Sequence, residues 1–330
     1  MRRMSEAVGT TGIGSWPGDR VPDAVRQVLE LWDLPFLPEL PGRGPAAEMV
    51  GRSLALLPEP AFELGRSGWR VSGRPGRDQR RAAALLRADL DQLAEAAAGY
   101  TGRLVVSLAG PWTLMSCVDL PRGGKVLGDP GARRDLVVAT TEAVDDLVGT
   151  VARLVPGAEV CAKLDEPALG AVLAGSVPTE SGLYRHPPLP VDEVRAGLRE
   201  LVARRPELVV HSCAPVPVGL LSQCRVATVA LDAALAGSQT RTEVGEHLDR
   251  GGSLWLGIVP TGPGAAVPSV AEVTARTLAW LRPLELGERL LGRLWLTPAC
   301  GLAGFSVPDA QAVAQVLRQA ARTVTDSLAG

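Results

Sequence analysis

Short apolar runs alternate with longer segments of helical periodicity along the 330-residue chain. Eight of these runs have the length and composition of buried strands. They lie at residues 9–15, 35–40, 103–110, 159–167, 208–214, 226–232, 253–260 and 294–300. Alternating strands and helices build parallel α/β folds, and eight such units suit a closed sheet. The pattern therefore predicts a single (β/α)8 TIM-type barrel domain over residues 1–330.

The segments between the strands are predicted to be mostly helical. Residues 21–32 and 308–324 carry apolar side chains at spacings of three and four, and a long helix is expected at about 78–99. The stretch 58–77 is rich in proline and glycine, and 170–191 has the composition of a loop. We expect both of these stretches to be irregular.

The composition excludes several classes of function. With 46% apolar and 21% charged residues and a net charge of −2, the chain is typical of a globular protein without a basic surface for nucleic acid. No apolar run reaches the roughly 18 residues of a membrane span. The N-terminus has no apolar signal region, so a cytoplasmic location is expected. Five scattered cysteines do not suggest a disulfide framework.

Polar residues follow the predicted strands at their C-terminal ends, where barrels of this type carry their active sites. His211 and Cys213 end the fifth predicted strand two positions apart, so both side chains point to the same side. Imidazole and thiolate are common zinc ligands. The other residues at strand ends are Ser15, Glu39, Asp165, Glu166, Asp232 and Cys300.

A zinc site at His211 and Cys213, completed by Cys300 and Asp232, is one interpretation of these residues. The alternative is structural, because an isolated His-x-Cys pattern is a weak signal and cysteine is often a small buried apolar residue. Asp232 could instead cap a loop or a helix. The remaining histidines, His186 and His247, fall in a loop and on a polar helix, where solvent exposure is expected.

Six segments in order resemble the C-terminal catalytic half of cobalamin-independent methionine synthase. The clearest is LDEPAL, which is similar to an Asp-Glu-Pro-Ala-Leu motif of that family. HSC and TPACGL resemble its zinc-ligand segments. The full set is TTGIGSWP (10–17), LPEL with AAEMV (37–50), LAGPWTL (108–114), LDEPAL (164–169), HSC (211–213) and TPACGL (297–302).

The resemblance implies a zinc-dependent methyltransferase that methylates homocysteine to methionine. Zinc on His211, Cys213 and Cys300 would hold the homocysteine sulfur as a thiolate, with Asp232 nearest to the family's fourth ligand. By the same resemblance, Asp165 and Glu39 would be the catalytic carboxylates that hold the substrate ammonium. Ser15 and its turn would bind the substrate carboxylate. Without the resemblance, Glu39 could be a surface charge, Asp165 a strand-end cap and Ser15 a turn former.

Three departures from the family concern the methyl donor. Nothing in the chain corresponds to the family's additional N-terminal barrel. Cys117 stands where the family has an indole facing the folate, and Thr261 is nearest to the place of a histidine linked to protonating the leaving group. A methylcorrinoid, delivered by a corrinoid protein, is therefore expected to be a better donor than methyltetrahydrofolate.

Two other functions remain open at the level of sequence. One is an enzyme of the same superfamily with different chemistry, either an alkyltransferase that acts on another thiol or a decarboxylase. The other is a non-catalytic zinc-binding barrel that stores or delivers the metal. A decarboxylase is disfavoured because the first strand lacks the arginines needed to hold several carboxylates.

Overall fold

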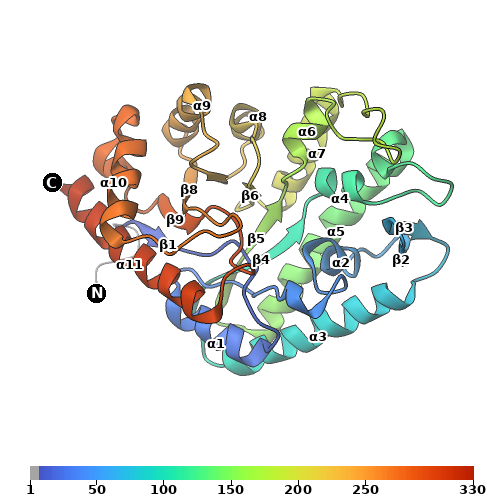
Figure 1. Ribbon diagram of the computed structural model, residues 1–330, viewed down its shortest axis with the longest axis horizontal. Coiled ribbons are helices and arrows are strands. Elements are labelled where there is room, and N and C mark those ends of the chain that lie inside the picture. Colours follow the sequence, from blue (N-terminus) through green and yellow to red (C-terminus); the bar gives the residue numbers. More distant parts are fainter. Residues whose placement is uncertain (1–6) are drawn as a thin grey trace.

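The computed structural model describes residues 7–330 and contains a curled, seven-stranded parallel sheet surrounded by helices (Figure 1). The strand order is β1-β9-β8-β7-β6-β5-β4, so the strands from β4 to β9 are adjacent in chain order and β1 pairs with the last strand, β9. The strands are β1 (Gly9–Thr10), β4 (Gly102–Ala109), β5 (Ala158–Asp165), β6 (Val209–Ser212), β7 (Thr228–Asp232), β8 (Ser253–Val259) and β9 (Leu294–Pro298). Residues 1–6, which belong to the segment expected to lack a signal region, lie outside the described range.

Seven of the eight predicted strands are present in this sheet, and the remaining one, predicted at residues 35–40, is irregular. Around residues 34–39 the chain makes isolated parallel bridges, from Leu34 to Thr11 on one side and from Phe36 to Val105 of β4 on the other. Backbone hydrogen bonds follow the same path, because Leu37 N–H donates to the Val105 carbonyl at 2.9 Å. Three prolines within residues 35–41 remove backbone donors, which explains why no regular ladder forms.

The helices lie around the outside of the curled sheet (Figure 1). The two helices expected near the ends of the chain are present, as is the long helix expected at about 78–99. The main helices are α1 (Val21–Leu31), α2 (Met49–Leu54), α3 (Arg77–Ala96), α4 (Pro111–Cys117), α5 (Pro130–Leu154), α6 (Leu169–Leu173), α7 (Val191–Arg204), α8 (Val218–Gln223), α9 (Ser238–Asp249), α10 (Val270–Leu281) and α11 (Val307–Ala329). Short 3-10 turns lie at Pro41–Arg43, Val126–Gly128, Arg282–Leu284 and Gly287–Leu290.

Side chains that accept backbone hydrogen bonds begin several of these helices. The Ser306 hydroxyl accepts a hydrogen bond from Asp309 N–H at the start of α11, and Asp129 caps α5 in the same way. Ser269 and Glu272 form a reciprocal capping box at α10. Each cap satisfies donors that the first turn of a helix leaves free.

The stretch 58–77, which was expected to be irregular, contains an antiparallel hairpin. Its strands are β2 (Ala61–Gly65) and β3 (Gly68–Ser72), and Gly68 at the turn has φ of +126°. A positive φ of this kind strongly favours glycine, which explains why a glycine-rich segment can form a tight hairpin. No helix within residues 7–330 is both long enough and apolar enough to cross a membrane.

Candidate active site

The register of the sheet places Asp165 and His211 side by side. Asp165 is the last residue of β5 and pairs with His211 of β6. Its Oδ1 lies 2.7 Å from Nδ1 of His211, and both side chains are buried. A carboxylate on one ring nitrogen fixes the orientation of the imidazole and leaves the other nitrogen to face a ligand.

Lys163 makes a second contact with the same carboxylate. It stands two residues before Asp165 on β5, so both side chains point to one side of the sheet. Its Nζ lies 2.5 Å from each oxygen of Asp165, and its side chain is 0% exposed. Burial opposes ionisation of Asp165, but the Lys163 ammonium and the His211 hydrogen bond hold its pKa below the usual value.

Two cysteines from distant parts of the sequence meet beside this pair. Cys213 follows β6 and Cys300 follows β9, and their side chains lie close enough to shift each other's pKa. The interaction with Cys213 lowers the pKa of Cys300 to about 6, and the interaction with Cys300 raises the pKa of Cys213. The nearby His211 also favours the thiolate of Cys300. Two adjacent sulfurs, of which one ionises easily, have the chemistry of a soft-metal site.

The second ring nitrogen of His211, Nε2, lies near the chain that follows the C-terminal end of β9. Its Nε2 lies 3.5 Å from the carbonyl oxygen of Ala299, the residue before Cys300. Two sulfurs and one imidazole nitrogen are thus a donor set that suits zinc. Within residues 7–330, however, no three His, Cys, Asp or Glu side chains are already arranged closely enough to hold a metal ion.

Asp232 lies close in register but its carboxylate is turned to its own loop. The register pairs Ser212 with Leu231, which places Asp232 beside Cys213 on the neighbouring strand. Its Oδ1 accepts a hydrogen bond from Ala234 N–H at 2.8 Å. The structure therefore shows the capping contact that the alternative interpretation of Asp232 described.

Glu39 and Ser15 lie together where the chain after β1 meets the segment at residues 34–39. A parallel bridge joins the two residues, and Trp16 N–H donates to the Glu39 carbonyl at 2.8 Å. Glu39 is only 6% exposed, and burial raises the pKa of its carboxyl group. Asp165 raises this pKa further, whereas Arg52 and Lys163 lower it. Glu39 is therefore close enough to Lys163 and Asp165 for their charges to shift the pKa of its carboxyl group.

Gly14, which follows the first strand, lies beside Glu39 and Ser107. Gly14 has φ of +120°, and a Cβ atom at this position would lie 3.5 Å from Glu39 Oε1 and 3.7 Å from the Ser107 hydroxyl. The Ser107 hydroxyl is buried and has no hydrogen-bond partner among the described residues. Ser107 pairs with Lys163 across β4 and β5. An unsatisfied hydroxyl is thus available to a ligand next to Glu39.

A buried ion network anchors the turn after Glu39. Asp89 of α3 accepts two hydrogen bonds from Arg43, both at 2.7 Å, and one from Arg52 of α2 at 3.0 Å. Asp89 is 1% exposed and Arg52 is 4% exposed. The network joins α3, α2 and the turn at Pro41–Arg43 beneath the candidate site.

Glu166 is the neighbour of Asp165 but points the other way and has a structural contact. Its carboxylate accepts hydrogen bonds from Trp112 N–H at 3.1 Å and from the Thr113 N–H and hydroxyl at 2.8 and 2.7 Å. These donors belong to the first turn of α4, which the carboxylate caps. Burial raises the pKa of Glu166 to about 8, although the three hydrogen bonds oppose this shift.

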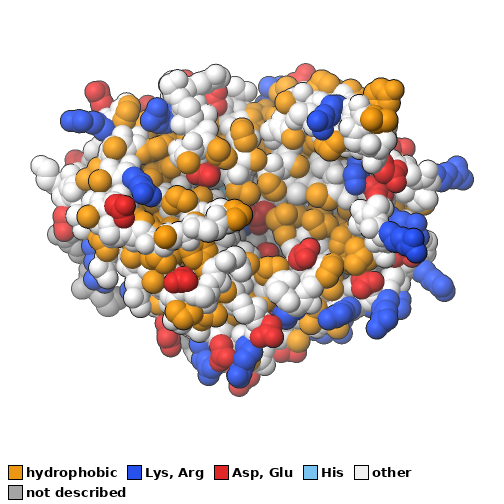
Figure 2. Space-filling model, in the orientation of Figure 1, with side chains coloured by type: hydrophobic (Ala, Val, Ile, Leu, Met, Phe, Trp, Pro, Cys, Tyr) orange, Lys and Arg blue, Asp and Glu red, His pale blue; other side chains and the backbone are white. Residues whose placement is uncertain are grey.

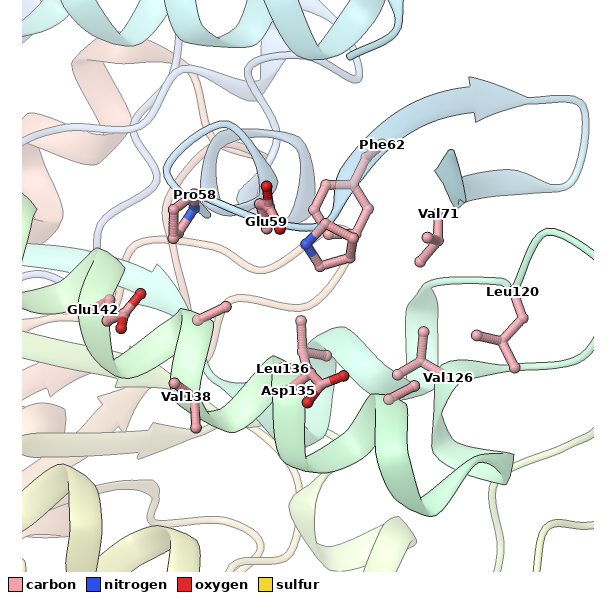
Figure 3. A pocket seen from close by; sticks show the side chains of 13 residues that line it. Pro58, Glu59, Phe62, Val71, Leu120, Val126, Asp135, Leu136, Val138 and Glu142 are labelled. Carbon is pink, nitrogen blue, oxygen red and sulfur yellow. The ribbon is translucent and has the colours of Figure 1, made fainter. Parts of the chain in front are cut away.

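Figure 2 shows a hollow near the middle of one face, with acidic side chains in and around it. A separate pocket of about 450 Å³ lies between α5 and the β2–β3 hairpin (Figure 3). Phe62, Val71 and Leu136 line this pocket, and Asp135 lies at its edge. We call Asp165, His211, Cys213 and Cys300 the strand-end cluster. None of these residues lines the pocket, so the pocket is distinct from the strand-end cluster.

Several solved structures resemble the chain. Among them is a B12-independent methionine synthase from Shewanella sp. W3-18-1 in complex with selenomethionine, with a TM-score of 0.66 and 14% sequence identity. The match covers 98% of this chain and 99% of that one. At this identity the likeness shows a shared fold. No family model matches the sequence, and no curated protein matches it either.

Two residues of the candidate site, Lys163 and Ser107, were not predicted from the sequence. Lys163 is one of only two lysines in the chain, and its position two residues before Asp165 on a strand already indicated a shared face. Ser107 gave no such signal, because only the pairing of β4 with β5 brings it to Lys163.

Proposed function

We propose that the protein is a zinc-dependent methyltransferase that transfers a methyl group to a small thiol, with Cys213, Cys300 and His211 as the metal ligands. The observation that carries the proposal is the meeting of the two cysteine side chains beside His211 at the strand ends. The resemblance of six sequence segments to methionine synthase supports it, as does the methionine synthase fold of the structural neighbour. That neighbour is in complex with selenomethionine, which is a methylated selenium counterpart of the proposed product class.

The proposal includes a closed eight-stranded barrel as the scaffold. The segment at residues 34–39 lies between β1 and β4 and makes backbone hydrogen bonds to both sides. If it counts as the eighth strand, Glu39 stands at a strand end like Asp165 and Cys300. All the candidate residues then face one mouth, as in other barrel enzymes.

Zinc, when bound, would keep the acceptor sulfur deprotonated at neutral pH. The chain's own residues then have separate tasks. Asp165 fixes the His211 ring through Nδ1, so that Nε2 is free to face the metal. Glu39 and the Ser107 hydroxyl offer a carboxylate and a hydrogen-bonding group to the rest of the acceptor. Asp232 would have to leave Ala234 to act as a fourth ligand, as the sequence resemblance implies.

A methylcorrinoid is the proposed donor, presented by a corrinoid protein, in preference to methyltetrahydrofolate. A folate amine leaves poorly unless an acid protonates it, and a positioned acid contributes about 10²–10⁴-fold. Thr261 and Cys117 stand where the resembling family has the histidine and the indole that serve the folate. The cobalt of a methylcorrinoid is released from the methyl group without being protonated.

A methyl-transfer assay tests the function. Zinc-loaded protein is incubated with homocysteine or another small thiol, and methylcobalamin and methyltetrahydrofolate are offered separately. We expect a methylated thiol with methylcobalamin, and faster turnover than with methyltetrahydrofolate. Equal or faster turnover with methyltetrahydrofolate would overturn the donor assignment, and no methylated thiol with either donor would overturn the proposed function.

The same assay separates the two other functions. An alkyltransferase of the same superfamily that acts on another thiol would leave homocysteine unmethylated and would alkylate a different thiol. A zinc-storage barrel would bind the metal and show no response to any thiol.

A further inference from the structure

We propose that Lys163 occupies at Asp165 the place of a substrate ammonium, so that the thiol acceptor needs no α-amino group. This inference rests on the proposed function, since it concerns the acceptor of that same site. It differs from the sequence-based expectation that Asp165 holds the ammonium of homocysteine. The chemical class it points to is a small thiol with a second polar or acidic group and no amine.

The geometry of the pair is already that of a complete ion pair. Nζ of Lys163 lies 2.5 Å from both oxygens of Asp165, and Oδ1 also lies 2.7 Å from His211. A buried carboxylate needs one cation to offset its desolvation, and Lys163 supplies it from within the chain. Asp165 therefore does not require a ligand to be neutralised.

Burial keeps the Lys163 ammonium in contact with the Asp165 carboxylate. The Lys163 side chain is 0% exposed and that of Asp165 is 8% exposed, so the ammonium cannot be displaced into solvent without opening the sheet. A substrate ammonium placed at Asp165 would lie close to a like charge in a poorly solvated site. Like charges at short range disfavour binding, and the effect is strongest where water is excluded.

The remaining carboxylate does not restore a strong ammonium site. Glu39 is buried, and burial raises the pKa of its carboxyl group, whereas the nearby Arg52 and Lys163 cations lower it, so cations of the chain already lie near its charge. The Ser107 hydroxyl beside it can donate to an acceptor oxygen or accept from a donor. Because cations of the chain already lie near both carboxylates, these groups suit a neutral polar end of the acceptor better than a cationic end.

Calorimetric binding of two matched thiols to the zinc-loaded protein tests the inference without requiring turnover. Homocysteine is compared with 4-mercaptobutanoate, which has the same thiol and carboxylate but no amino group. We expect the parent protein to bind 4-mercaptobutanoate at least as tightly as homocysteine. The Lys163→Met variant frees Asp165, so it should shift the ratio of the two Kd values toward homocysteine by about tenfold or more.

Lys125→Met is the matched control. Lys125 is the only other lysine and also pairs with an aspartate, Asp119, at 2.6 Å, away from the strand-end cluster. The Lys125→Met variant should leave the ratio of the two Kd values unchanged. If Lys163→Met does not fold, Lys163→Gln removes the same charge while keeping a hydrogen-bond donor, and the parent protein alone still gives the primary comparison.

The outcomes separate this inference from the function on which it rests. A parent protein that binds homocysteine tenfold or more tightly and methylates it overturns the inference and leaves the proposed function intact. An unchanged ratio in a folded Lys163 variant also overturns it. If neither thiol binds and neither is methylated, both the inference and the proposed function fail.

Discussion

Asp89→Asn is the substitution that tests how the turn after Glu39 is held. Asp89 is the one carboxylate in the network that pairs with both Arg43 and Arg52. The Asn side chain has nearly the same shape and can still accept a hydrogen bond through its amide oxygen. What the substitution removes is the negative charge, and it leaves two guanidinium groups facing a neutral side chain.

The burial of the three side chains sets the magnitude. Side-chain exposure is 1% for Asp89, 5% for Arg52 and 12% for Arg43, so solvent cannot compensate the lost charge at Arg52 and does so only partly at Arg43. Removing one partner of a buried ion pair costs about 3–5 kcal/mol. Because one hydrogen bond survives in the variant, we expect a loss of about 3 kcal/mol in the free energy of unfolding.

Urea unfolding at pH 7.5, followed by circular dichroism, measures this loss. Asp91→Asn is the matched control, since Asp91 lies on the same helix and is exposed to solvent. The control should change the free energy of unfolding by less than about 0.5 kcal/mol. Asp89→Asn should also weaken thiol binding, because the turn at Pro41–Arg43 follows Glu39 directly. Equal stability of the two variants would refute the role given to the buried network.

Three further substitutions test other contacts. Gly110→Ala should destabilise the protein by about 1–3 kcal/mol in urea unfolding, because the added Cβ would lie 2.0 Å from Oε1 of Glu166; a neutral result would contradict the tight approach. Gly301→Ala should weaken thiol binding in calorimetry but keep zinc, since its Cβ would meet the Ser15 hydroxyl; unchanged affinity would argue against Ser15 as a contact. His247→Gln should flatten the loss of stability between pH 7.5 and 5.5, because burial lowers the pKa of His247 and only the unfolded state takes up a proton below about 6.5. A parent protein with no such loss would show that His247 does not resist protonation.

The sequence predicted the main elements of the fold because their signals are local. Period-two and buried apolar runs identify the strands of the sheet, and the spacing along 308–324 identifies the helix that the structure has as α11. The hairpin β2–β3 was missed because its two strands are short and its stretch is rich in proline and glycine. The expectation of a solvated His247 was wrong: it is 2% exposed, and its Nε2 lies 3.1 Å from the Ser253 carbonyl. A polar helix can still bury a single side chain against a neighbouring strand end.

The candidate site was predictable where residues share a strand and less so where they do not. The spacing of His211 and Cys213 on β6 indicated one face, and the spacing of Lys163 and Asp165 contains the same information. The contact of Cys213 with Cys300 depends on how β6 and β9 curl toward each other, which no local pattern encodes.

The central claim, a metal site at Cys213 and Cys300, is tested most directly by zinc content. Zinc is measured by atomic absorption in purified parent protein and in the Cys213→Ser, Cys300→Ser and Cys224→Ser variants. Cys224 is a buried cysteine whose sulfur contacts only the Arg195 carbonyl among the described hydrogen bonds, so its variant is the control. We predict one zinc per chain in the parent and the control, and loss of most of the metal in the other two variants. Full zinc retention in both Cys213→Ser and Cys300→Ser, or no zinc in the parent, would contradict the account.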